Sequence, residues 1–120
     1  MNAVRQLFIQ GKTKVFPYKE VFLNLIPARM IGAYLLFNEG KVIYCGRSDT
    51  DLRRRLRYHN YRPAATHFTF YPCRTPILSY LLEKRLYQRH LPALNFNYPA
   101  YPGGYGQQDT TILLPLFKKN

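Results

Sequence analysis

Acidic residues are scarce in this chain of 120 residues. Six Asp and Glu stand against 18 Lys and Arg, which gives a formal net charge of +12. Such an excess implies a polyanionic partner, for which nucleic acid and an anionic membrane surface are the two usual choices. A membrane-surface binder is the less favoured choice, and it predicts vesicle binding without any preference for nucleic acid.

Long apolar runs and paired cysteines are also lacking. No run approaches the length of about 18 residues that a membrane span needs, and Met1–Lys14 lacks the continuous apolar core of a signal peptide. Cys45 and Cys73 lie far apart and fit no zinc-ligand spacing, so we expect reduced strand residues. These absences predict an intracellular protein, cytoplasmic or nucleoid-associated, with no membrane partner.

What remains is enough for one folded domain. Hydrophobic residues make up 47% of the chain, so we expect a core that needs neither disulfides nor a structural metal. We divide the chain into an N-terminal extension that packs on the domain (1–30), a central module (31–97), and a C-terminal loop with a short strand in the same domain (98–120).

The residue pattern predicts an α/β fold with a small, mostly antiparallel three-stranded sheet flanked by helices. The expected elements are a short helix at Tyr18–Ile26, a hairpin at 31–45, a helix at 50–59, a strand at His67–Cys73, a helix at 76–90 and a last strand at Thr111–Phe117.

The hairpin has a readable turn. Ile31–Phe37 and Lys41–Cys45 flank Asn38-Glu39-Gly40, a three-residue loop whose Gly suits a left-handed conformation. If Phe37 pairs with Lys41, then Tyr34 lies opposite Tyr44, about 5 Å away at Cβ. A slip of one residue would send the two phenols to opposite faces of the sheet.

The two main helices each show an inward stripe. For the first, Ser48, Asp49 and Thr50 are candidate caps, and the stripe by spacing is Leu52, Arg55, Leu56 and His59. For the second, Pro76 suits the first turn, and the row is Leu78, Leu82 and Leu86, with Glu83 just beside it.

Two tripeptides carry a family resemblance. Gly32-Ala33-Tyr34 and Tyr44-Cys45-Gly46 resemble the paired motifs that name the GIY-YIG nucleases, and their separation suits that family's first hairpin. Ala33 and Cys45 depart from the pattern, because Ile is usual at the first of these positions and Ile or Val at the second.

The resemblance continues downstream and covers about residues 31–97. Further matches are a helical Arg with a His four residues on, a Glu in the second helix and an Asn near the end of the module: Arg55, His59, Glu83 and Asn95. The stretch from Gly46 to Arg55 is one residue longer than usual, so Arg54 is the alternative counterpart. The inward stripe and the spacing to His59 favour Arg55.

The family implies a set of catalytic residues, Tyr34, Tyr44, Arg55, His59 and Glu83, and a divalent metal, Mg²⁺ or Mn²⁺, on Glu83. One of the tyrosines accepts a proton from the attacking water or orients it, and the sequence does not distinguish them. Arg55 stabilises charge on the phosphate. One carboxylate suffices for a one-metal hydrolase, whereas the plainer alternative for Glu83 is a salt bridge to a basic neighbour such as Arg85.

A second set of residues is expected to bind nucleic acid: Arg47, Arg53, Arg54, Arg57, His67 and Asn95. Arg47 takes the place of a Lys found in excision-repair incision subunits, and His67 falls near a second His of some homing endonucleases. His59 and His67 either bind phosphate and assist proton transfer or are polar residues at the rim. Asn95 either holds a phosphate or orders the loop after the second helix. The arginines, interleaved with Tyr58 and Tyr61, form either a backbone-binding patch or a solvated basic face.

The sequence therefore predicts a metal-dependent endonuclease that acts on DNA. The choice of DNA over RNA comes from the family, and the residues do not exclude RNA. With no obvious recognition domain beside the module, specificity is structural, supplied by a partner, or obtained by forming a homodimer on the substrate. The alternative is a non-catalytic nucleic-acid-binding module with the same fold.

Overall fold

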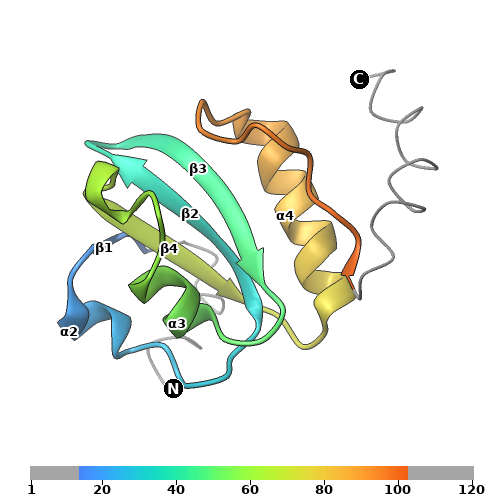
Figure 1. The fold of residues 1–120 in the computed structure, drawn as a ribbon, viewed down its shortest axis with the longest axis horizontal. Helices are drawn as coiled ribbons and strands as arrows, with labels where there is room; N and C mark the ends of the chain where they lie inside the picture. The colour runs from blue at the N-terminus through green and yellow to red at the C-terminus, as the bar shows by residue number, and fades with distance from the viewer. Residues whose placement is uncertain (1–13, 103–120) are drawn as a thin grey trace.

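The computed structural model describes residues 14–102, and it has an α/β fold built on a four-stranded antiparallel sheet (Figure 1). The strand order is β1-β4-β2-β3. The strands are β1 (Phe16–Pro17), β2 (Gly32–Asn38), β3 (Lys41–Ser48) and β4 (His67–Pro72). The helices are α2 (Glu20–Leu23), α3 (Leu52–Arg57), the 3-10 turn η1 (Arg62–Ala64) and α4 (Pro76–His90). The strand expected at 111–117 lies outside the described residues.

The prediction of three strands was wrong by one, because the N-terminal extension contributes β1. Phe16 and Pro17 pair with Phe68 and His67 of β4. A two-residue strand that contains Pro gives no alternating pattern in the sequence, and it forms here because Phe16 packs against the aromatic rings of β4. Helix α2 is likewise shorter than the predicted helix at Tyr18–Ile26.

The sheet separates two cores. Helices α2 and α3 cover one face, and α4 covers the other (Figure 1). Tyr34 and Leu36 of β2 point toward α3, while Ala33 and Leu35 point toward α4, as strand alternation requires. The segment after α4 turns back along that helix, where Tyr98 packs on Tyr87 and Tyr101 on Tyr80.

The predicted hairpin register was wrong in two places. The turn has two residues, Glu39 and Gly40, both at positive φ (47° and 86°), so Asn38 pairs with Lys41. The register then shifts again between Leu36 and Phe37, because Ile43 is an extra residue on β3 that forms a β-bulge.

The two shifts cancel in their effect on side-chain direction. Tyr34 lies opposite Gly46 and Tyr44 lies opposite Leu36, so the phenols are diagonal neighbours instead of a directly opposed pair. They still share one face, and their ring centroids are 6.2 Å apart. Without the bulge, the two-residue turn alone would have placed them on opposite faces.

Helix α3 starts later than expected. Its cap is Asp51, whose side chain accepts a hydrogen bond from the backbone N–H of Arg54 at 3.1 Å, and none of the three predicted cap residues takes that role. Ser48 instead accepts from the backbone N–H of Asp51 at 2.8 Å. The helix ends at Arg57, so His59 follows the helix and does not belong to it.

Helix α4 spans the predicted residues and begins after Thr75, whose hydroxyl accepts from the backbone N–H of Leu78 at 3.1 Å. Its inward face agrees with the predicted row at Leu82 and Leu86, which pack in the core on this side of the sheet, and differs at Leu78. Leu78 is exposed, whereas Ser79, Glu83 and Leu86 are buried. Glu83 therefore lies on the face that packs against the sheet.

Within residues 14–102, every helix is too short or too polar to reach across a lipid bilayer.

Candidate active site

Tyr34 lies at the centre of a buried hydrogen-bonded cluster. Its ring is fully buried, and its hydroxyl lies 2.8 Å from Nε2 of His59 and 3.3 Å from Nε of Arg55. The backbone N–H of Tyr61 donates to Nδ1 of His59 at 3.0 Å. Because Nδ1 accepts, the neutral imidazole carries its proton on Nε2 and donates it to Tyr34. The Tyr34 oxygen thus accepts from both neighbours and holds them in place.

Burial determines the protonation states in this cluster. It raises the pKa of Tyr34 well above its usual value, and the nearby Arg55 only partly opposes this. Burial, helped by the charge of Arg55, lowers the pKa of His59 to about 4. Both side chains are therefore neutral at neutral pH.

Arg55 connects the buried cluster to solvent. It comes from α3, its Nε donates to Tyr34, and the residue as a whole is exposed. Arg54 instead places its guanidinium over the ring of Tyr58, 5.7 Å from the centroid. Of the two arginines that the sequence left open, Arg55 is the one in contact with the first tyrosine.

Gly46 allows the tyrosines to pack closely. A Cβ at this position would lie 2.5 Å from the hydroxyl oxygen of Tyr34 and 3.0 Å from the ring of Tyr44. Only a residue without a side chain leaves room for both rings above edge strand β3. The packing of the two tyrosines therefore explains why the second tripeptide has Gly at this position.

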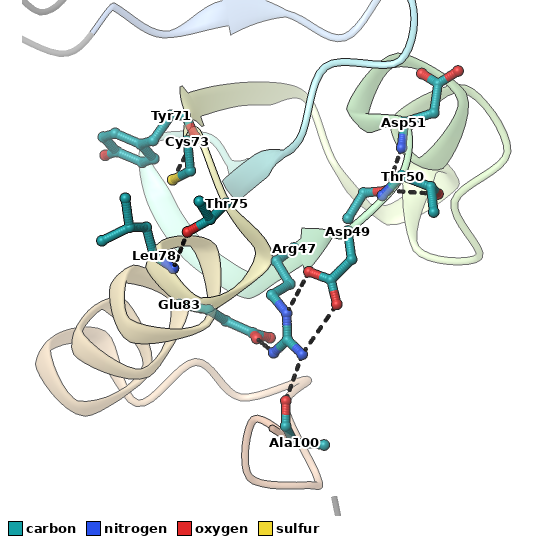
Figure 2. A network of polar contacts seen from close by, with 11 residues as sticks. Arg47, Asp49, Thr50, Asp51, Tyr71, Cys73, Thr75, Leu78, Glu83 and Ala100 are labelled. Carbon is teal, nitrogen blue, oxygen red and sulfur yellow. Dashed lines mark hydrogen bonds and ion pairs between the residues drawn. The ribbon is translucent and has the colours of Figure 1, made fainter. Parts of the chain in front are cut away.

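Arg47 and Glu83 form the charged part of the site (Figure 2). Nη1 of Arg47 lies 2.6 Å from Oε1 of Glu83, and Nε lies 2.9 Å from Oδ1 of Asp49. The backbone carbonyl of Ala100 accepts a further hydrogen bond from Nη2. One guanidinium on β3 thus joins α4, the loop after β3 and the segment after α4. The salt-bridge alternative for Glu83 is met by Arg47, 36 residues away, and not by Arg85.

Glu83 is 9% exposed, and its environment acts on the pKa in opposite directions. Burial raises the pKa of this carboxyl, while Arg47 and, more weakly, Arg55 favour the charged form. The net direction is upward. Any further cation near Glu83 would lower the pKa and favour the carboxylate.

These residues meet at a pocket of about 240 Å³, here called the Glu83 pocket. Its lining includes Tyr44 and Arg47 from β3, Asp49 from the following loop, Arg55 from α3 and Glu83 from α4. Tyr44 is half-buried, whereas Tyr34 is sealed beneath the surface. Of the two tyrosines, only Tyr44 reaches this pocket.

The donor set of the Glu83 pocket fits the divalent metal that the family resemblance implies. Mg²⁺ takes oxygen ligands, and it accepts one or two carboxylates while water and substrate oxygens fill its other positions. Glu83 supplies one carboxylate, and Asp49 lines the same pocket. Among the described residues, no group of three or more His, Cys, Asp or Glu is gathered as a complete metal cage. Arg47 is the competitor for the Glu83 carboxylate.

Asn95 fastens the segment after α4 to edge strand β3. Its Oδ1 accepts from the backbone N–H of Cys45 at 2.9 Å, and its Nδ2 donates to the Cys45 carbonyl at 2.8 Å. The backbone N–H of Leu94 adds a bond to the Ile43 carbonyl at 3.1 Å. Both ends of the Asn95 amide are used within the protein, which favours the loop-ordering role over the phosphate-binding role.

The other expected nucleic-acid-binding residues fall into different places. Arg53 is half-buried on α3, and Arg54 lines a pocket of about 330 Å³ together with Ser48, Thr50 and Arg55. Arg57 is engaged within the protein, since it bonds Glu20 at 2.6 Å and Asn24 at 2.9 Å.

His67 is not brought to the site. It pairs with Phe37 near the hairpin turn, and its Nδ1 lies 2.9 Å from the Thr66 hydroxyl. Its side chain alternates with that of Phe68, which packs in the core on the Tyr34 face, so it points to the opposite face of the sheet.

Asp49 was missed as a site residue. The sequence presented it only as a cap candidate, although two positions after Arg47 an acidic residue can reach the same side of an extended chain. Asn97, which also lines the Glu83 pocket, was missed too, because nothing in the sequence shows that the segment after α4 returns to β3.

No protein-family model matches the chain, and a search of curated proteins finds no match either. The GIY-YIG resemblance therefore depends on the motif residues and their order along the chain, and membership of that superfamily is a proposal.

Proposed function

We propose that this protein is a divalent-metal-dependent endonuclease of the GIY-YIG type that hydrolyses phosphodiester bonds of intracellular DNA. One observation carries the proposal: Tyr44, Arg55 and Glu83 come from three different elements and line one open pocket. A hydroxyl, a guanidinium and a carboxylate in one pocket are the groups that phosphodiester hydrolysis needs, because they orient water, stabilise charge and hold a metal.

In this proposal Glu83 holds Mg²⁺ or Mn²⁺, with Asp49 beside it. The metal, when bound, supplies charge neutralisation at the phosphate and at the leaving oxygen. Arg47 keeps the buried Glu83 carboxylate paired before the metal arrives, so the carboxyl does not need to take up a proton to remain in the core.

Tyr44 and Arg55 act on the substrate. Burial raises the pKa of Tyr44, so in the free protein it is a neutral hydroxyl that orients the attacking water. Arg55 presents its guanidinium to the phosphate, where a planar fork of donors matches the developing charge. Tyr34 and His59 lie behind Arg55 and fix its direction, which makes them positioning residues.

A second candidate function is favoured by the Arg47–Glu83 ion pair. A carboxylate already neutralised by an arginine is also what a non-catalytic DNA- or RNA-binding module would keep as a structural salt bridge. This candidate predicts salt-sensitive binding with no cleavage in any metal.

The test uses the full chain with single-stranded, duplex and branched DNA, in Mg²⁺, Mn²⁺ or EDTA. We expect cleavage only with metal, and a loss of roughly 100-fold or more in Glu83→Gln, which keeps the shape of the side chain. Glu39→Gln in the exposed hairpin turn is the matched control and should cleave like the wild type.

Cleavage that persists in EDTA, or full activity in Glu83→Gln, would contradict the proposed mechanism. Intact DNA in every lane, together with binding that weakens as salt rises, would contradict the nuclease proposal and support the non-catalytic binding module.

A further inference from the structure

A second pocket of about 300 Å³ adjoins the Glu83 pocket. The two share four lining residues, namely Tyr44, Arg55, Asn95 and Asn97. We call it the aromatic pocket, because Tyr58, Tyr61 and Phe96 line it alongside Tyr44. Its volume is at the lower end of the range for small-molecule sites, about 300–1,000 Å³.

The walls of the aromatic pocket are ring surfaces held at fixed distances. The Tyr44 ring centroid lies 5.0 Å from that of His59 and 5.2 Å from that of Tyr61. His59 is fixed on both sides, by Tyr34 and by the Tyr61 backbone. This part of the pocket is therefore pre-organised.

The rim carries two rings that are largely exposed to solvent. Tyr58 is 70% exposed and Phe96 is 79% exposed, although both are large apolar side chains. Tyr58 comes just after α3, and Phe96 comes from the segment that Asn95 ties to β3. Arg54 lies over the Tyr58 ring. The remaining surface of that ring and the Phe96 ring are open to solvent beside Arg55, which lines the same pocket.

We infer that the aromatic pocket receives an unpaired nucleobase of the nucleotide strand whose phosphate lies at Arg55 and Glu83. This inference rests on the proposed function, and it narrows the substrate to single-stranded, branched or otherwise unpaired nucleic acid. Aromatic side chains bind bases through stacking, which tolerates any sequence because every base has a π-face.

The position of the pocket requires that the base leave its helical stack. Tyr44 and Arg55 border both pockets, so a base in the aromatic pocket belongs to a nucleotide next to the bound phosphate. Inside a duplex both faces of a base are covered by its neighbours, and a stacking pocket can take it only after it has turned out.

The polar lining suits the edge of a base. Asn60 and Asn97 are exposed residues of the aromatic pocket, and each amide offers both a donor and an acceptor. Such groups can bond any base edge, so the pocket selects for an unpaired base and not for one base type.

The test is a binding measurement in EDTA, by fluorescence anisotropy, so that cleavage does not interfere. The probes are a labelled single-stranded DNA, the same strand without bases, a matching duplex, and RNA of the same sequence to show which polynucleotide supplies the base. We compare the wild type with Tyr58→Ala and Phe96→Ala, whose exposed rings can be removed without opening the core. Leu81→Ala, 50% exposed on α4, is the control.

We expect each aromatic variant to bind the single strand about 5- to 100-fold more weakly, with little change for the duplex. Removing the bases from the strand should weaken binding by the wild type, and it should lower the affinity of the aromatic variants much less. Leu81→Ala should behave as the wild type.

Two results would overturn the inference: equal affinity of the wild type for strands with and without bases, or aromatic variants that bind like Leu81→Ala. Neither result would bear on the nuclease proposal, which the cleavage assay tests separately. If the protein does not cleave DNA but its affinity still depends on the bases, the nuclease proposal fails and the base-binding site stands.

Discussion

Gly46 leaves no room for a side chain beside the two tyrosines of the candidate site. An alanine there would bring its Cβ within 2.5 Å of the Tyr34 hydroxyl, and Tyr34 cannot withdraw because its ring is fully buried. We expect Gly46→Ala to lower the free energy of unfolding by about 1–3 kcal/mol, measured by urea denaturation, and to reduce any cleavage.

Gly40→Ala is the comparison for that variant. A Cβ at Gly40 meets nothing within 4 Å, so its cost is limited to the positive φ, about 1 kcal/mol. A Gly46→Ala protein as stable as the wild type would show that the tyrosine pair repacks, and would contradict the tight geometry described for the site.

His59 makes stability depend on pH. Its pKa is lowered from 6.5 to about 4 in the folded protein, so the unfolded chain binds the proton more readily between these values. The stabilisation is fully present above pH 6.5 and is lost as the pH falls toward 4. We expect protonation of His59 to lower the free energy of unfolding by on the order of 3 kcal/mol as the pH falls across that window.

The measurement compares urea unfolding above pH 6.5 and near pH 4 for the wild type, His59→Gln and the control His67→Gln. The pH dependence should become shallower only in His59→Gln. The same steep dependence in all three proteins would show that His59 is not held neutral by its surroundings.

At the scale of elements, helix α4 ends on a strained residue. Leu91 caps it in the left-handed conformation (φ 42°) and is 69% exposed, so its side chain gains little from burial. Glycine adopts this conformation without a steric cost, so Leu91→Gly should raise the free energy of unfolding by about 1 kcal/mol.

Leu81→Gly provides the matched comparison, since it is the same substitution at an exposed site in the interior of the same helix. It should lower stability by about 1 kcal/mol. If Leu91→Gly raises the free energy of unfolding and Leu81→Gly lowers it in one denaturation series, the strained cap is supported. A change in the same direction for both variants would count against it.

The elements differ in how far the sequence predicts them. Helix α4 is readable because Pro76 marks its first turn and because it runs long enough to show a period. Strand β1 is not, since two residues have no period, and its pairing with β4 depends on ring packing between distant segments.

The residues of the candidate site also differ in how far the sequence predicts them. The contact of Arg55 with Tyr34 agrees with the helix spacing. The predicted shared face of Tyr34 and Tyr44 is correct, but the register behind it is wrong, because the sequence showed neither the two-residue turn nor the bulge. The pairing of Arg47 with Glu83 joins residues far apart in the chain, and only packing of α4 against β3 brings them together.

At the scale of the whole molecule, the net charge of +12 should make nucleic-acid binding fall steeply with salt. The exposed Arg54 should contribute to this slope, and Arg57 should not, because Glu20 and Asn24 already bind it. We expect Arg54→Gln to reduce the slope of log K against log salt by about 1, and Arg57→Gln to leave it unchanged.

A titration at several salt concentrations measures these slopes for the wild type and both variants. A flat response in the wild type would argue against a phosphate-tracking surface, and a loss of slope in Arg57→Gln would show that its contacts open when nucleic acid binds.

The β-bulge at Ile43 also has a consequence for how this chain can change. Whether Tyr34 and Tyr44 meet depends on whether the pairing between them is displaced by an even or an odd number of residues. The tight turn and the bulge each contribute one step, and together they restore an even count. A single insertion or deletion between Tyr34 and Tyr44 would therefore separate the rings, whereas two such changes within that stretch would bring them back to the same side.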